Sequence, residues 1–155
     1  MVISPRLRNF VGRHRVLAAD TMVFIYHLEE HPRYAAATQG ILSAWEKGPH
    51  RGVTSILSLS EVLVKPLREG DRGVAEDYRR LLTTFPNMRL LDVTRGIAEI
   101  GARIRAAHGL SLPDGIQVAT ALAAGATGFI SNDPDFKRVP DIEVLLLDEV
   151  TPARR

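Results

Sequence analysis

Short apolar runs alternate along the chain with longer segments in which apolar residues recur every three or four positions. The short runs predict buried strands at residues 16–19, 52–54, 88–91, 129–130 and 144–147. The helical spacing predicts helices through residues 22–26, 34–45, 56–67, 74–85, 97–104 and 113–123. Strands that alternate with helices are joined by right-handed crossovers into a parallel sheet. The predicted fold class is therefore α/β, a three-layer α/β/α sandwich around a central, mostly parallel sheet.

Several residues mark where these elements end and how the chain is divided. Gly48-Pro49 ends one helix, Thr94 can cap the start of another, and Gly109 ends it. No repeat, low-complexity tract or long linker interrupts the chain. We expect a basic extension over residues 1–15, one domain over 16–150, and a C-terminal tail over 151–155.

The extension carries four arginines, Arg6, Arg8, Arg13 and Arg15. We expect a loose, solvated tail, with an accessory phosphate contact as the alternative.

Composition narrows the class of protein. The chain has 155 residues, of which 45% are hydrophobic and 25% charged, so it is neither a disordered nor a collagen-like sequence. It has no cysteine, which excludes disulfides, thiolate zinc sites and a cysteine nucleophile. The formal net charge is +2, and arginine dominates because only three lysines are present. Arginine suits phosphate binding, but GC-rich codon usage explains the bias equally well. No signal-peptide core or membrane span is apparent, so we expect a cytoplasmic protein.

Four acidic residues fall where strands end or where the following helices begin. Asp20 ends the first strand, and Glu61 lies in the helix that follows the second. Asp114 opens a helix behind Pro113, and Asp133 follows the Phe129-Ile130 strand. In a parallel α/β sheet, ligands bind at the edge where the carboxyl ends of the strands open.

Each acid also has a purely structural interpretation. The Asp114 carboxylate could interact favourably with the positive end of the helix dipole, and Asp133 could form a turn before Pro134. Asp20 and Glu61 lie among apolar neighbours, so we expect both to point into the protein. Burying carboxylates is costly unless a cation or a proton offsets their charge.

A hard divalent cation is the natural counter-charge for several carboxylates. Mg²⁺ and Mn²⁺ take oxygen ligands and are commonly completed by a substrate phosphate. The sequence therefore predicts metal-assisted hydrolysis of a phosphodiester bond, without a histidine general base.

Four motifs, in this order and spacing, resemble those of the PIN-domain ribonucleases, and the size resembles VapC-type toxins of type II toxin–antitoxin pairs. The resemblance runs from about residue 17 to 147. The motifs are Asp20-Thr21, Ser60-Glu61-Val62-Leu63, Pro113-Asp114 with Ala119-Thr120-Ala121, and Asn132-Asp133-Pro134-Asp135-Phe136.

The resemblance implies an endoribonuclease that depends on Mg²⁺ or Mn²⁺, leaves 5′-phosphate and 3′-hydroxyl ends, and is neutralised by an antitoxin. It also implies a homodimer, for which the stripe of Val74, Tyr78, Leu81 and Phe85 is one candidate surface and core packing the alternative. The residues that it implies as catalytic and metal-binding acids are Asp20, Glu61, Asp114 and Asp133.

The resemblance also implies supporting roles for other residues, and the sequence differs from the family pattern at two positions. Thr21 and Ser131 would lie behind the acids as supporting hydroxyls, with Asp135 beside them, and Arg138 is a candidate contact to the RNA backbone. Gly115 stands where alanine is common in the family, and Ser131 replaces a frequent threonine.

Two alternatives belong to other functional classes. His27-Leu28-Glu29-Glu30-His31 matches a zinc-protease pattern, but Pro32 disfavours a helix that would place both imidazoles on one face. A catalytically silent PIN-like module that binds RNA or a protein is the other alternative. The sequence lacks the second aspartate of haloacid-dehalogenase phosphatases, the acidic pair of receiver domains, nucleotide-binding glycine motifs and a GxSxG elbow.

Overall fold

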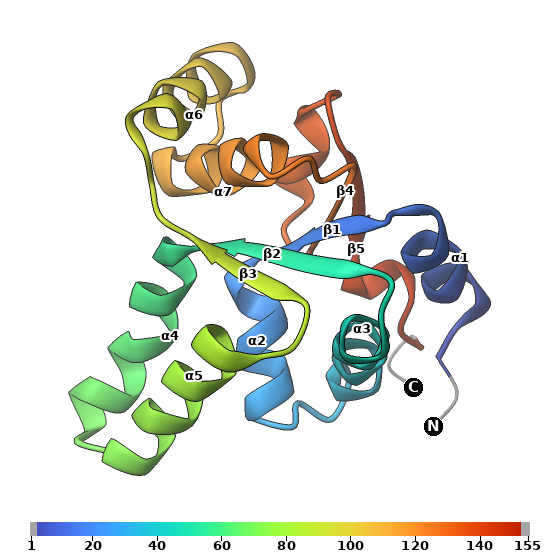
Figure 1. Cartoon of the computed structure of the whole chain (residues 1–155), viewed down its shortest axis with the longest axis vertical. Coiled ribbons are helices and arrows are strands. Elements are labelled where there is room, and N and C mark those ends of the chain that lie inside the picture. Colours follow the sequence, from blue (N-terminus) through green and yellow to red (C-terminus); the bar gives the residue numbers. More distant parts are fainter. Residues whose placement is uncertain (1–2, 153–155) are drawn as a thin grey trace.

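A five-stranded, fully parallel sheet forms the centre of the protein, whose computed structural model describes residues 3–152 (Figure 1). The strand order is β3-β2-β1-β4-β5. The strands are β1 (Val16–Ala19), β2 (Arg51–Ser55), β3 (Met88–Leu91), β4 (Gly128–Ser131) and β5 (Glu143–Leu146). The predicted α/β/α class is confirmed.

Helices connect successive strands and cover both faces of the sheet. Two of them, α6 and α7, lie on one face, and α2 to α5 lie on the other (Figure 1). The α-helices are α1 (Pro5–Arg13), α2 (Thr21–Leu28), α3 (Ala35–Lys47), α4 (Ile56–Glu69), α5 (Arg72–Thr84), α6 (Arg95–His108) and α7 (Leu112–Ala123). Short 3₁₀ turns are η1 (Pro134–Arg138) and η2 (Leu147–Glu149).

Side chains of the central strands alternate between the two layers. On β1, Leu17 and Ala19 pack into the α1–α5 layer, whereas Ala18 packs into the α6–α7 layer. On β4, Phe129 and Ile130 likewise face opposite sides. Because both faces are covered, these strands are mostly apolar, which is why they are visible as short runs in the sequence.

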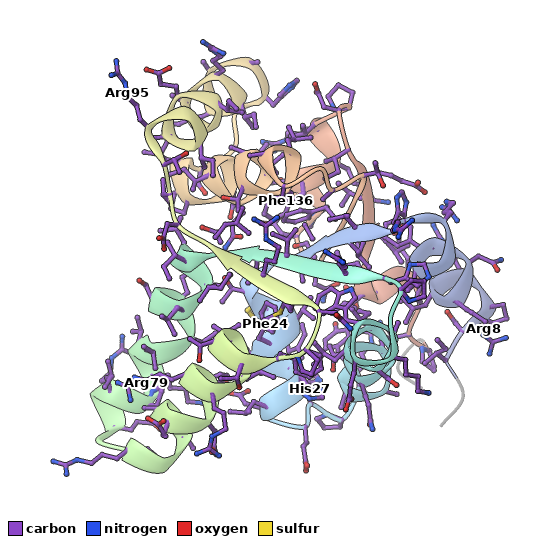
Figure 2. The ribbon with its side chains drawn as sticks, viewed as in Figure 1. Arg8, Phe24, His27, Arg79, Arg95 and Phe136 are labelled. Carbon is purple, nitrogen blue, oxygen red and sulfur yellow. The ribbon has the colours of Figure 1, made fainter. Side chains whose placement is uncertain are left out.

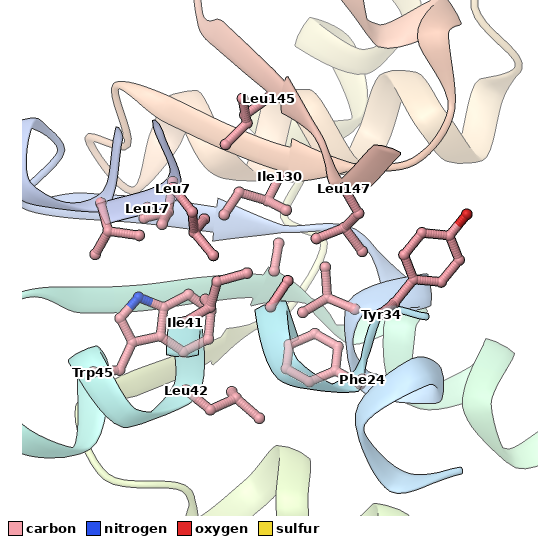
Figure 3. Close-up of a cluster of buried hydrophobic side chains, with 14 of the residues drawn as sticks. Leu7, Leu17, Phe24, Tyr34, Ile41, Leu42, Trp45, Ile130, Leu145 and Leu147 are labelled. Carbon is pink, nitrogen blue, oxygen red and sulfur yellow. The ribbon is translucent and has the colours of Figure 1, made fainter. Parts of the chain in front are cut away.

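The larger core lies between the sheet and helices α1 to α5 (Figure 3). Trp45 at the end of α3 is fully buried there. A Cβ atom at Gly52 on β2 would lie 2.5 Å from the Trp45 ring, so glycine allows the indole to pack directly on the strand. On the two sides of the sheet, Phe24 and Phe136 point inward, while Arg8 and Arg95 extend from the periphery (Figure 2).

The N-terminal segment differs from the expected solvated tail. Residues 5–13 form α1, and the apolar residues Leu7, Phe10 and Val11 are buried in the same core as α2 and α3. His14 closes the helix, and its two ring nitrogens lie 2.8 Å from Thr127 Oγ1 and from a Glu143 carboxylate oxygen. The three arginines of α1 obscured its short apolar face, which consists of Leu7, Phe10 and Val11.

Three of the helix ends predicted from the sequence are confirmed. The Thr94 hydroxyl accepts a hydrogen bond from the Ile97 amide, and Gly109 ends α6 with a left-handed φ of 72°. Gly48 ends α3. Between residues 3 and 152, none of the helices combines the length and the apolar character needed to cross a bilayer.

The connectivity reverses direction at β1. Chain segments leaving β1 and β2 build the sheet toward β3, whereas the segment leaving β3 returns to pair β4 with the other side of β1. The crevice outside the carboxyl ends of β1 and β4 is therefore the topological switch point, where α/β sheets bind their ligands.

Candidate active site

Asp20 lies at this switch point, directly after β1. Its backbone amide donates to the Ile130 carbonyl at 2.9 Å, which holds it against β4. The carboxylate caps α2 by accepting from the Thr21 amide at 2.8 Å, and its other oxygen accepts from the Ser131 hydroxyl at 2.8 Å. Only 8% of Asp20 is exposed, as expected from the sequence.

Asp133 is tied to Asp20 through Ser131. The Asp133 amide donates to the Ser131 hydroxyl at 3.0 Å, so one buried serine joins the ends of β1 and β4. Asp133 also has the turn role considered above, since one of its carboxylate oxygens accepts from the Asp135 amide at 2.9 Å. The structural and the functional interpretation of Asp133 are thus compatible, because the second oxygen is not used by the turn.

Asp114 lies at the same edge of the sheet, at the start of a helix that runs antiparallel to the strands. Helix α7 leads into β4, so its N-terminus lies beside the carboxyl ends of the strands. The Ser111 hydroxyl caps this helix by accepting from the Asp114 amide at 3.3 Å, and Asp114 is half-buried in the first turn.

Glu61 is more exposed than its apolar neighbours predict, although its carboxylate lies near the buried side chains of Thr21 and Gln117. The buried face of α4 consists of Ser58, Val62 and Pro66, which leaves Glu61 exposed beside that face. Glu61 lines a cavity of about 380 Å³ between α2, α4 and α5. The apolar neighbours were misleading because Val64 and Leu67 are themselves more than half exposed.

The acids influence one another electrostatically. Burial raises the pKa of Asp20 to about 6, and the charges of Asp114 and Glu61 contribute to the increase. Partial desolvation of the Glu61 carboxylate beside α2 and α7, followed by the Asp114 charge, raises the pKa of Glu61. Partial burial together with the charges of Asp133 and Asp135 raises the pKa of Asp114. Among the described residues, none of the four proposed acids forms an ion pair with lysine, arginine or histidine.

The four acids share one edge without forming a closed cluster. In the described part of the chain, no three acidic or histidine side chains are close enough together to hold a metal ion by themselves. Uncompensated carboxylates repel one another, and Mg²⁺ is usually held by one or two carboxylates with water and phosphate oxygens. An all-oxygen donor set with excess negative charge and no cationic partner therefore fits a hard divalent ion.

A family model for the PIN domain matches residues 18–142, which include all four acids, the end of β1 and the whole of β2, β3 and β4. The chain belongs to the PIN domain family. No curated protein matches this PIN-domain chain.

Solved structures of toxin–antitoxin proteins share the fold of this PIN domain. VapBC2 from Rickettsia felis, bound to a promoter DNA fragment, superposes with a TM-score of 0.68 at 15% identity, covering 84% of this chain and 98% of the other. A toxin–antitoxin complex from Klebsiella pneumoniae gives 0.65 at 23% identity, covering 84% and 97%. VapC20 from Mycobacterium tuberculosis, a toxin that cleaves the sarcin–ricin loop, gives 0.66 at 19% identity, covering 83% and 98%.

Other candidates from the sequence have structural roles in this PIN domain. Helix α2 ends at Leu28, and His31 lies beyond it, where its Nδ1 accepts from the Arg33 amide at 3.2 Å. His27 and His31 therefore share no helix, and the zinc-protease pattern is a chance match. The Arg138 guanidinium lies 3.0 Å from Asp135 and also bonds the Gly109 carbonyl.

The candidate dimer stripe on α5 packs inward. Tyr78 is buried, and Val74, Leu81 and Phe85 pack against the core below the sheet. Core packing is therefore the role of this stripe within the chain.

Beneath the acids lies a set of buried polar residues that the sequence pattern did not predict as part of the site: Thr54, Ser58 and Gln117, which join Thr21. The available signal was a glutamine within an otherwise apolar stretch of α7, one helical turn after Asp114. Polar residues at buried helix positions need a partner, which the sequence does not reveal.

Proposed function

We propose that this PIN-domain protein is an endoribonuclease that depends on Mg²⁺ or Mn²⁺ and acts as the toxin of a toxin–antitoxin pair. The observation that carries the proposal is the group of uncompensated acids at the topological switch point. Asp20, Glu61, Asp114 and Asp133 would hold the cation.

The ion and the residues of this chain would have separate roles. A divalent ion, when bound, supplies charge neutralisation at the phosphate and lowers the pKa of water. Thr21 and Ser131 orient the two Asp20 oxygens, and the Asp135 amide orients one oxygen of Asp133. Since these bonds exist before substrate arrives, the carboxylates would need little reorganisation when the RNA phosphate binds.

The fold relatives support the biological part of the proposal. The structures from Rickettsia felis and Klebsiella pneumoniae are toxin–antitoxin assemblies, and the Mycobacterium tuberculosis protein cleaves RNA. We propose by extension that this chain forms a homodimer, acts in the cytoplasm and is neutralised by a cognate antitoxin.

The test is cleavage of bulk tRNA by the purified chain with Mg²⁺ or Mn²⁺. We expect cleavage to stop in EDTA and to be abolished in Asp20→Asn, because the ion loses its most buried carboxylate. Asp141→Asn, at an exposed turn before β5 and so at the opposite edge of the sheet, is the matched control.

Three results would contradict the proposal. Cleavage that persists in EDTA or in Asp20→Asn would exclude this site. Tight Mn²⁺ binding without cleavage of any RNA would favour the catalytically silent binding module. Growth arrest on expression that Asp20→Asn does not relieve would argue against the toxin role.

A further inference from the structure

Four buried polar side chains form a hydrogen-bonded network beneath the proposed acids. Thr21 comes from α2, Thr54 from β2, Ser58 from α4 and Gln117 from α7, and each is at most 2% exposed. The Ser58 hydroxyl lies 3.0 Å from that of Thr21 and 2.8 Å from that of Thr54. The Gln117 amide nitrogen donates to Ser58 at 2.9 Å and to Thr21 at 3.3 Å.

The direction of every hydrogen bond in this network follows from counting donors. Thr54 donates its only hydroxyl proton to the Ala19 carbonyl at 2.9 Å, so Ser58 must donate to Thr54. Ser58 then has no proton left for Thr21, so Thr21 donates to Ser58. The Gln117 amide, the only member with two protons to give, donates one to Ser58 and one to Thr21, which fills both acceptor sites of Ser58 and one of the two on Thr21.

Three of the four members of this network lie close in sequence to one of the acids. Thr21 follows Asp20 directly, Ser58 precedes Glu61 by three residues, and Gln117 follows Asp114 by three residues. Residues three apart on a helix are neighbours on its surface, about one turn from each other. The network therefore joins three elements at the turns that carry three acids.

We propose that Gln117 is a positioning residue that fixes the spacing of Asp20, Glu61 and Asp114 for the divalent ion, by holding α7 to α2 and α4. This inference rests on the proposed function. Without the amide, two buried hydroxyls lose a donor, and the side-chain hydrogen bonds that Gln117 makes from α7 to α2 and to α4 are lost.

The test is calorimetric titration of the full-length, metal-free protein with MnCl₂. Gln117→Met keeps the length of the side chain and removes both donors. We expect its Mn²⁺ dissociation constant to increase by about 10- to 100-fold, the effect typical of groups that orient metal ligands. Ser58→Ala breaks the same network from α4 and is expected to give a similar loss, which the double variant does not exceed.

The matched control is Thr38→Val. Thr38 is fully buried on α3 and donates to the Ala35 carbonyl, so the variant loses one buried hydrogen bond away from the acids. We expect it to lower the unfolding temperature without changing Mn²⁺ affinity, whereas a purely structural role of Gln117 would make the two variants alike.

These measurements test the positioning role of Gln117 separately from the proposed nuclease function. Unchanged Mn²⁺ affinity in folded Gln117→Met, with normal binding by the wild type, overturns the positioning role alone. Equal weakening in Thr38→Val also overturns it. A wild-type protein that binds no Mn²⁺ overturns the proposed function and the positioning role together.

Discussion

Asp20 is the residue at which stability and function are expected to conflict. Its carboxylate is buried, and its pKa in the folded protein is about 6, against about 3.9 for an aspartate in an unfolded chain. Between these values the folded state binds more protons than the unfolded state, so the free energy of unfolding falls as pH rises. A difference of about two pKa units corresponds to a loss on the order of 3 kcal/mol, complete above about pH 6.

We therefore expect Asp20→Asn to stabilise the metal-free protein. Asparagine keeps an oxygen to cap α2 and has no charge to bury. In EDTA at pH 7.5, the variant should be about 1–3 kcal/mol more stable than the wild type, and this advantage should vanish near pH 4. Urea unfolding at both pH values measures the effect, with Asp141→Asn as control, and a less stable variant at pH 7.5 would contradict it.

At the scale of elements, the contact between α6 and α7 explains an unusual residue beside Asp114. A Cβ atom at Gly115 would lie 2.7 Å from the Gly101 carbonyl oxygen. A Cβ at Gly101 would in turn lie 2.9 Å from the Ile116 side chain and 3.2 Å from its Cα. Glycine at position 115 thus allows α6 to approach the first turn of α7.

The expected consequence is that Gly115→Ala destabilises the protein although alanine favours helices. Forcing a methyl group against backbone typically costs about 1–3 kcal/mol, more than the gain of up to about 1 kcal/mol from replacing a helical glycine. The melting temperature should fall by several degrees. The control is Gly73→Ala on α5, where the nearest atom is an Asp71 oxygen at 3.6 Å and the residue is exposed. An increase in melting temperature in Gly115→Ala equal to that of the control would show that the helices can separate at no cost.

At the scale of the whole molecule, the same strands support two hydrophobic cores. Ala18 and Phe129 belong to the core under α6 and α7, while their neighbours Ala19 and Ile130 belong to the core under α1 to α5. Because both cores pack against the same strands, unfolding of one core would expose the other, so the two should unfold together.

We predict a single cooperative transition in urea. Trp45 is the only tryptophan and lies in the larger core, so its fluorescence reports on that side of the sheet, while far-ultraviolet circular dichroism reports on all helices. The two midpoints should coincide. A second transition seen by circular dichroism alone would mean that the α6–α7 layer unfolds separately.

Some features of this protein are determined by neighbouring residues, and these could be predicted from the sequence. The strand at 16–19, the cap at Thr94 and the end of α6 at Gly109 depend on spacing and dihedral preference within a few residues. The place of Asp20 after the first strand, and hence at the carboxyl edge of the sheet, follows from the same local pattern and the rule of parallel connections.

Only the tertiary structure decided which distant residues meet. Gln117 bonds Thr21 across 96 positions of the chain, α1 packs into a core although its sequence is rich in arginine, and Glu61 stays exposed although its neighbours are apolar. Each depends on how helices pack across the sheet, because hydrophobic periodicity specifies that a face is buried but not what it is buried against.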